Sequence, residues 1–552
     1  MGLFSKSSSN RTSSKPSISE RSASLASSNS SLQSPTLGFG KRSSQPTSSS
    51  GPAPFSPTTS APSHRPQIPM PKAPDPLIDP AAYLRSIGSV RARCSVLLEK
   101  ALDNDLNHFD VDMSKFDDSV AFVVSIIKRD FAPDYSTIPP HGRWQHFNVG
   151  GKDRVSHLLQ SWPSSVDTSE RTRRLLDLFL VSVLLDAGAG TAWSYKSKEN
   201  GKMYRRSEGL AVASLEMFKA GMFSSDPDQP FRVDSDGLRR LTVESMGKGL
   251  QVTPQNPIAG LDGRANLLIR LSKALENRQY FGDDSRPGNI IGEAAISRSH
   301  QHLLIRLSKA LENRQYFGDD SRPGNIIDYL ISHPTTQISS VPIVPLPTLW
   351  HVLMDGLGPI WPASRTVIDG VSLGDAWPLS SMPRESNSAE WETIVPFHKL
   401  TQWLCYSLMQ PMSVLMHIHF AGAELMTGLP EYRNGGLFID TGVLTLKPEQ
   451  MAKGLARFSS EADRNGQKCM EVVPMFEASD DVVVEWRAVT VGFLDMLLAK
   501  VNTELGLSGE EALSLPQMLE AGSWKGGREI AEVTRPNTKE PPIMIISDGT
   551  VF

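Results

Sequence analysis

Apolar residues recur at intervals of three and four positions along most of the chain after residue 76, which is typical of amphipathic helices. The segments with the clearest pattern are Ala81–Asn104, Arg171–Leu185, Glu208–Ala220, Ala265–Tyr280, Phe397–Phe420 and Val482–Leu505. Pro411 lies past the middle of the fifth segment and is expected to kink or break it, because proline removes a backbone donor. The pattern predicts a mostly helical protein.

Runs with the character of β-strands are few. They are Leu437–Leu446, Val472–Phe476 and Ile543–Ile546. The connections between the helical segments are rich in glycine and proline, as loops usually are. The predicted fold class is therefore mainly α with a small β-sheet (α+β).

Residues 1–75 have a different composition, dominated by Ser, Pro and Thr with almost no apolar side chains. Such a segment cannot bury enough surface to offset the entropy lost on ordering, so it is expected to be a disordered tail. Residues 76–552 are expected to form one mainly helical domain of enzyme size.

One segment of this domain occurs twice. Leu267–Ile291 is repeated without a single change at Leu303–Ile327. The repeats of a solenoid differ from one another because each copy meets different neighbours, so an unchanged pair indicates a recent tandem duplication or an error in the gene model. Only one copy is expected to occupy the native position.

Composition narrows the classes of function. The chain has 552 residues, of which 39% are apolar and 21% charged, and a formal net charge of -4. This balance gives no electrostatic reason to expect nucleic acid or an anionic membrane as partner, and it favours a small-molecule substrate. The sequence contains no P-loop, no paired metal-ligand spacing and no Ser nucleophile elbow, so no cofactor or metal is expected. Without a long apolar segment or a secretory signal, the expected location is the cytoplasm.

The segment Pro430–Val443 carries the main candidate chemistry. A Gly-Gly pair is expected to form a turn that leads into a short strand. Glu431, Tyr432 and Arg433 precede the turn, and Asp440 lies at the end of the strand. Two carboxylates beside an arginine suit general acid–base work with an anion-binding group, so Glu431 and Asp440 are the candidate catalytic residues. A solvated turn followed by a capping aspartate explains the same spacing.

Two further segments supply candidate substrate-binding residues. Gly142–Arg154 interleaves Trp144, His146 and Phe147 with arginines, which suits a platform for a heterocycle and donors for a phosphate or sugar. Leu185–Tyr195 ends a predicted helix in a loop of small residues that contains Asp186 and Trp193. Structural roles also account for these side chains, Arg154 included.

In their order along the chain, these segments resemble the uracil-catabolism protein family, that of the fourth protein of the yeast-type uracil degradation route. Further segments that carry the resemblance are Arg206–Leu210, Glu485–Arg487, Arg535-Pro536 and Asp548–Thr550. The likeness extends from about residue 77 to the C-terminus. It implies a role in a route with ribosylated intermediates that releases urea-type nitrogen. Members are often labelled uracil phosphoribosyltransferases, but this chain lacks the phosphate loop of that class.

The residues and the resemblance lead to the hypothesis of an N-glycosidic bond hydrolase acting on a ribosylated pyrimidine-derived intermediate such as a ribosylurea. Glu431-Tyr432-Arg433 is also similar to the acid-Tyr-Arg segment of the queuosine-salvage glycohydrolases. In this hypothesis Asp440 stabilises positive charge on the sugar or activates water, and Glu431 is the second acid or accepts a ribose hydroxyl. Arg433 binds a phosphate or orients Glu431. The alternatives are a phosphoribosyltransferase and a non-catalytic scaffold or regulator of the pathway.

Overall fold

The computed structural model describes residues 70–186, 192–258, 261–275, 314–317, 321–362, 364–383, 389–465 and 471–546. The predicted tail, residues 1–75, lies almost entirely outside them. The described helices are α1 (Pro80–Arg85), α2 (Ile87–Leu102), α3 (Phe116–Phe131), α4 (Arg143–Phe147), α5 (Arg154–Ser161), α6 (Thr168–Leu184), α7 (Arg206–Lys219), α8 (Ser235–Arg239), α9 (Val243–Gly249), α10 (Leu261–Leu275), α12 (Arg314–Phe317), α13 (Ile326–Ser332), α14 (Leu346–Gly356), α15 (Lys399–Met416), α16 (Tyr432–Asp440), α17 (Pro448–Asn465), α18 (Asp481–Leu505), α19 (Leu515–Met518) and α20 (Trp524–Thr534).

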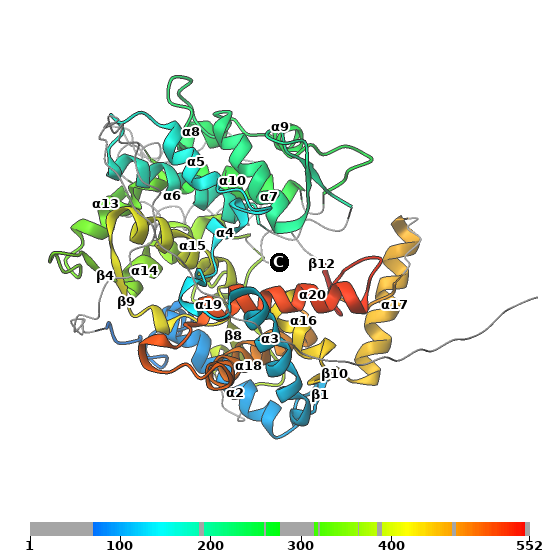
Figure 1. The fold of residues 1–552 in the computed structure, drawn as a ribbon. Helices are drawn as coiled ribbons and strands as arrows, with labels where there is room; N and C mark the ends of the chain where they lie inside the picture. Colours follow the sequence, from blue (N-terminus) through cyan, green and yellow to red (C-terminus); the bar gives the residue numbers. More distant parts are fainter. Residues whose placement is uncertain are drawn as a thin grey trace, which may run out of the picture. The chain divides into compact units, whose positions relative to one another are not determined.

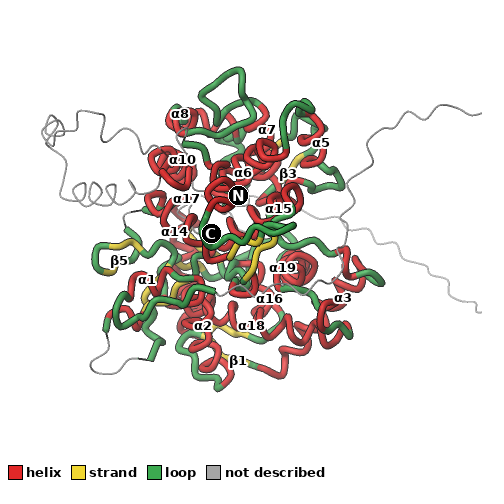
Figure 2. Tube along the Cα trace, turned by 90° about the vertical axis from the view of Figure 1, so that its left-hand side faces the viewer, coloured by secondary structure: helices red, strands yellow, loops and turns green. Residues whose placement is uncertain are grey.

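The strands of the described residues are short and join in separate pairs (Figure 2). The antiparallel pairs are β1 (Phe109–Val111) with β10 (Leu444–Leu446), β2 (Tyr195–Lys196) with β3 (Met203–Tyr204), β5 (Val367–Ile368) with β6 (Val371–Ser372), and β7 (Ala376–Pro378) with β8 (Ile394–Pro396). The parallel pairs are β4 (Ile343–Pro345) with β9 (His419–Ala421), and β11 (Met475–Glu477) with β12 (Met544–Ile546). The predicted mainly α class is confirmed.

Most of the helical segments predicted from apolar periodicity are present, with three differences. The segment Ala81–Asn104 is divided at Ser86, whose backbone is extended. Pro411 lies inside α15, and this helix continues past it to Met416 before β9 begins. The predicted helix Ala265–Tyr280 is described only as far as Leu275, where α10 ends.

The apolar side chains gather in two large buried clusters. The first includes residues of α6, α7, α14 and α15, and the second includes residues of α2, α3, α16 and α18. In Figure 1 the helices α6, α7 and α10 lie in the upper half of the view, and α2, α3, α16, α18 and α20 lie in the lower half. Among the described helices, none combines the length and the apolarity needed to cross a membrane.

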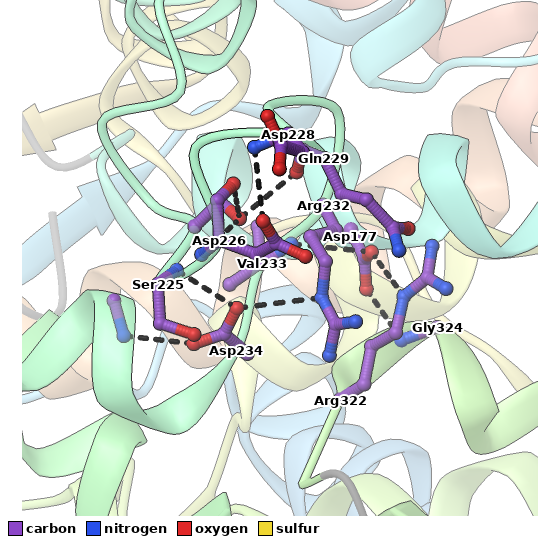
Figure 3. Close-up of polar contacts among 12 residues, drawn as sticks. Asp177, Ser225, Asp226, Asp228, Gln229, Arg232, Val233, Asp234, Arg322 and Gly324 are labelled. Carbon is purple, nitrogen blue, oxygen red and sulfur yellow. Dashed lines mark hydrogen bonds and ion pairs between the residues drawn. The ribbon is translucent and has the colours of Figure 1, made fainter.

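Part of the duplicated segment is anchored on α6 (Figure 3). The fully buried Asp177 carboxylate accepts hydrogen bonds from Arg322 Nε at 2.7 Å, from the Gly324 amide at 2.7 Å and from the Val233 amide at 3.2 Å. A Cβ on Gly324 would lie 2.5 Å from the Arg173 carbonyl oxygen, so this close approach requires glycine. The second copy therefore supplies the residues docked here, whereas residues 276–291 of the first copy lie outside the described residues.

Candidate active site

The segment that carries the candidate carboxylates is a helix, so the prediction of a strand over Leu437–Leu446 is wrong for its first part. Glu431 is the N-cap of α16, and its side chain accepts a hydrogen bond from the Asn434 amide at 2.6 Å. A carboxylate in this position satisfies an otherwise unpaired amide and interacts favourably with the helix dipole. Only Leu444–Leu446 of the predicted strand is extended.

The Gly-Gly pair is not a turn but the contact face of α16. A Cβ on Gly435 would lie 2.8 Å from the Trp486 indole, and a Cβ on Gly436 would lie 2.9 Å from Pro542. The Trp486 Nε1–H also donates to the Gly435 carbonyl oxygen at 3.1 Å. The two glycines therefore let α16 lie directly against α18 and the C-terminal segment, which sequence spacing alone does not reveal.

Helix α16 also lies very close to α20. A Cβ on Gly527 would be 2.1 Å from the carbonyl oxygen of Arg433, so no side chain fits there. A turn of π-helix, Leu519–Ser523, precedes α20, and its Ser523 hydroxyl donates to the Asn434 side chain at 2.8 Å. These contacts fix the first turn of α16 relative to the first turn of α20.

The first two turns of five helices meet at this place and form what we call the polar cluster. Its members are Arg143 and His146 of α4, Asp186 after α6, Glu208 of α7, Lys399 and Trp403 of α15, Glu431 and Arg433 of α16, and Trp524 and Arg528 of α20. Helices α4, α7, α15 and α16 begin here, whereas α20 continues from the π-helical turn Leu519–Ser523. Helix N-termini carry partial positive charge, so the four that begin here favour ionised carboxylates and ligand acceptor atoms.

Arg433 is the central cation of the cluster. Its residue is 3% exposed and its guanidinium lies over the Trp524 ring, 4.2 Å from the centroid. Among the residues that the structure describes, none accepts a hydrogen bond from its Nε, Nη1 or Nη2. Burial lowers the pKa of Arg433, but the acidic groups of Tyr432, Glu208, Glu431 and Asp186 outweigh burial and leave the pKa raised. Arg433 is therefore a charged fork of donors that has no acceptor among the described residues.

Arg143 holds Asp186 and His146 in place. Its Nη1 lies 2.8 Å from Asp186 Oδ2 and 3.2 Å from His146 Nδ1, and its Nε donates to Ser182 at 2.7 Å. Since a guanidinium only donates, His146 Nδ1 accepts, and a neutral His146 carries its proton on Nε2. Burial and then the charge of Arg143 hold the pKa of His146 well below its ordinary value, which keeps the ring neutral.

Two carboxylates of the cluster share one pattern. Asp186 is bound through Oδ2 to Arg143, and Glu208 is bound through Oε1 to Arg528. In the described part of the chain, the other oxygen of each, Asp186 Oδ1 and Glu208 Oε2, is buried without a hydrogen-bond partner. Burial raises the pKa of Glu208, but the charges of Arg433 and Arg528 outweigh it and leave the pKa lowered.

Aromatic side chains line the same place. The His146 ring stacks on Trp524 with centroids 5.1 Å apart, and it lies 5.3 Å from Trp403. Trp403 is 3% exposed, and within the described ranges its Nε1–H has no partner. Lys399 completes the cluster: burial lowers the pKa of its amine, against the charges of Asp186 and Glu431.

Asp440 lies outside the polar cluster. It is the last residue of α16, so at a rise of about 1.5 Å per residue it lies about 13 Å along the axis from Glu431. Both its oxygens accept from Arg535, at 2.8 and 2.6 Å, and its side chain is 6% exposed. The catalytic carboxylates of glycoside hydrolases lie roughly 5 to 10 Å apart, which this placement does not match.

The other predicted binding residues lie in the surrounding core. Trp144 and Phe147 pack against Phe179, with ring centroids 5.9 and 5.0 Å apart. The buried Arg154 donates to Glu199, to the carbonyl oxygens of Phe147 and Val149, and to the Tyr204 hydroxyl. The buried Trp193 donates to the Leu250 carbonyl oxygen. Of the predicted site residues, the structure brings together Glu431, Arg433, His146 and Asp186, beside Tyr432. Trp144, Phe147, Arg154 and Trp193 do not belong to this group.

Sequence reasoning did not name six of the ten residues of the polar cluster, which are Arg143, Glu208, Lys399, Trp403, Trp524 and Arg528. Glu208 belongs to a segment that carries the family resemblance, so its motif was a usable signal. Lys399, Trp403, Trp524 and Arg528 lie near the start of amphipathic helices, where an isolated aromatic or basic residue gives no distinct signal. Within the described ranges, no group of three or more His, Cys, Asp or Glu side chains is placed to hold a metal ion.

Comparison with known proteins identifies the family. The profile of the family described as "Protein of unknown function (DUF1688)" matches residues 83–302 and 296–552. The chain belongs to this family. Among similar proteins, "Uracil catabolism protein 4" of Lachancea kluyveri is 43% identical over 481 residues, which cover 86% of this chain and 99% of that protein. "Protein urg3" of Schizosaccharomyces pombe is 43% identical over 472 residues, or 85% of this chain and 98% of that protein.

These relatives confirm the resemblance noted in the sequence. The DUF1688 match falls into two stretches, and the division lies between the two copies of the duplicated segment. Each relative is covered almost to its full length, so the likeness includes every segment of the polar cluster.

Proposed function

We propose that the chain acts in uracil catabolism as a hydrolase of the N-glycosidic bond of a ribosylated intermediate such as a ribosylurea. The name of the Lachancea kluyveri relative supports the pathway. The observation that carries the reaction is the pair of buried carboxylates, Asp186 and Glu208, each held by an arginine through one oxygen and each with its second oxygen unpaired among the described residues.

Breaking a C–N glycosidic bond builds positive charge on the sugar ring, and a fixed carboxylate stabilises that charge. Glu208 suits this role because Arg433 and Arg528 keep its pKa low despite burial, so it stays ionised. Asp186 Oδ1 then accepts a proton from the attacking water. The water oxygen bonds to C1′ and the C–N electron pair leaves with nitrogen. That nitrogen takes up a proton from solvent, and Asp186 releases to solvent the proton that it accepted from water. Glu431 accepts a ribose hydroxyl with the oxygen that does not cap α16.

The test is to incubate the purified full chain with ribosylurea and to follow urea and ribose release. We expect Glu208→Gln and Asp186→Asn to lower kcat/KM by about 10²- to 10³-fold, the usual cost of removing one fixed electrostatic or acid–base group. Glu529→Gln is the matched control, since Glu529 lies on α20 in a surface ion pair with Arg129. Full activity of both site variants would refute the assignment.

The same assay addresses the two alternatives. A phosphoribosyltransferase would consume uracil only when a phosphoribosyl donor and magnesium are present. A non-catalytic scaffold would release neither urea nor ribose, and uracil-dependent growth would survive the triple replacement of Glu208, Asp186 and Arg433. Either result would replace the hydrolase proposal.

A further inference from the structure

We propose that Arg433, His146 and Trp403 bind the carbonyl oxygen of an uncharged, planar ureide, which is the leaving group of the reaction. The inference rests on the proposed function and goes further, because it names the part of the substrate that these residues recognise. It also means that the substrate enters the polar cluster without a phosphate group.

The inference starts from the donors of the cluster that have no acceptor in the described part of the chain. Arg433 presents a planar fork of N–H groups from a side chain that is 3% exposed, and Trp403 presents Nε1–H from a side chain equally buried. His146 presents Nε2–H, because its Nδ1 accepts from Arg143. A buried donor without a partner loses its hydrogen bonds to water and gains none in return, so a ligand acceptor is expected between them.

Two of these donors, Arg433 of α16 and His146 of α4, lie against one indole, and the third, Trp403 of α15, lies next to His146. Arg433 lies 4.2 Å from the Trp524 centroid and His146 lies 5.1 Å from it, while Trp403 lies 5.3 Å from His146. Both Arg433 and His146 lie against the Trp524 ring, so a ligand reaches their edges and does not stack on that ring. An acceptor such as a carbonyl oxygen fits this geometry.

The unpaired acceptors argue against a phosphate. Asp186 Oδ1 and Glu208 Oε2 can only accept, and a phosphate dianion offers them no hydrogen. A phosphate on Arg433 would also lie near the three carboxylates of Glu208, Glu431 and Asp186, whose charges act on that guanidinium. A ureide instead combines a carbonyl oxygen with N–H groups, and the attached ribose adds hydroxyl donors. Its polarity therefore complements both sets of atoms.

Arg433 gains a chemical role from this placement. As the C1′–N bond breaks, the electron pair that leaves with nitrogen is shared with the ureide carbonyl oxygen. A guanidinium at that oxygen binds the departing ureide more tightly than the intact substrate, which lowers the barrier. Nitrogen then takes up a proton from solvent, and neutral ureide and ribose result.

Binding can be measured without turnover by titrating the full chain with uracil, with N-methylurea and, separately, with inorganic phosphate in a calorimeter. We expect both ureides to bind, with at least tenfold weaker binding to Arg433→Lys, because a lysine lacks the planar fork. Arg174→Lys is the matched control: Arg174 also lies over an indole, 5.3 Å from the Trp162 centroid, but far along the chain on α6. Phosphate that binds and displaces uracil would overturn the inference.

The second part of the test compares the turnover of two ribosides. Arg433→Lys is expected to lower kcat/KM for ribosylurea by about 10²- to 10³-fold and that for 4-nitrophenyl riboside, which has no ureide carbonyl, by less than tenfold. Equal losses on both substrates would show that Arg433 does not contact the leaving group. If the wild-type chain cleaves neither riboside but still binds ureides through Arg433, the hydrolase proposal fails while the ureide site stands.

Discussion

The ion pair of Asp375 and Arg487 allows a quantitative test of how the first turn of α16 is supported. Arg487 Nη1 and Nη2 each donate to one Asp375 oxygen at 2.8 Å, and the two side chains are 2% and 1% exposed. Arg487 Nε also donates to the Pro430 carbonyl oxygen at 3.2 Å, directly before Glu431. The pair therefore links β7 and α18 to the turn that carries the candidate site.

Asp375→Asn removes the charge and one acceptor oxygen but keeps the shape. Breaking a buried pair by altering one partner typically costs 3 to 5 kcal/mol, and since asparagine retains one acceptor we expect about 3 kcal/mol. With an unfolding entropy near 2.1 cal/mol/K per residue over the roughly 480 residues after the tail, about 3 kcal/mol lowers Tm by about 3 °C. Differential scanning calorimetry at pH 7 measures this shift against Glu529→Gln, the surface-pair control, for which we expect less than 1 °C.

The pH dependence sharpens this test. Burial raises the pKa of Asp375, but the charge of Arg487 outweighs burial and holds the pKa well below its ordinary value. A carboxyl with a depressed folded-state pKa stabilises the fold above the unfolded value, near 3.9, and loses that contribution as the pH falls further. The Tm difference between wild type and Asp375→Asn should stay constant from pH 8 to 5 and shrink below about pH 4. If Asp375→Asn has the same Tm as the control Glu529→Gln at every pH, the reasoning is refuted.

Three further changes test other contacts. Gly527→Ala places a methyl group 2.1 Å from the Arg433 carbonyl oxygen, so calorimetry should show a loss of about 1 to 3 kcal/mol in the free energy of unfolding, and uracil should bind more weakly. Gly88→Ala is the control: a Cβ there meets nothing within 4 Å, so neither quantity should change. Burial lowers the pKa of His398 to about 4, so the free energy of unfolding of the wild type should fall by about 3 kcal/mol as the pH drops from 6.5 to 4. His398→Asn suits the left-handed backbone at this position and should reduce that dependence of stability on pH. Deletion of residues 276–311 restores one copy of the duplicated segment and should leave Tm and ureide binding unchanged; a large loss of either would show that both copies are needed.

Periodicity predicted the helices well where one side of the helix faces a core. The segments Arg171–Leu185 and Val482–Leu505 match α6 and α18 to within a few residues, because their apolar side chains are buried at helical spacing. The segment Leu437–Leu446 failed for a tertiary reason. Gly435 and Gly436, which directly precede it, let the chain pack as a helix against Trp486 and Pro542, residues far along the chain, so local propensity gave the wrong element.

Site residues were predictable when they lay in a motif and not otherwise. His146, Asp186 and Arg433 were named because each lies in a segment of unusual composition. Trp403 and Trp524 lie in ordinary amphipathic helices, and their proximity to His146 depends on how α4, α15 and α20 pack. A single sequence does not encode such convergence in any local pattern.

The contacts at the two ends of α16 also give Asp440 a structural role that its sequence position did not suggest. Helix α16 is held near its N-terminus by Trp486 and Arg487, which bind the Gly435 and Pro430 carbonyl oxygens, and at its C-terminus by Arg535, which binds Asp440. A short helix fixed at both ends cannot rotate about its axis, so the direction in which Arg433 projects is fixed as well. The Glu485–Arg487, Arg535 and Asp440 motifs then share one physical task, which is to direct the Arg433 guanidinium toward the first residues of α4, α7, α15 and α20. Through its pair with Arg535, Asp440 therefore supports the polar cluster from the far end of α16.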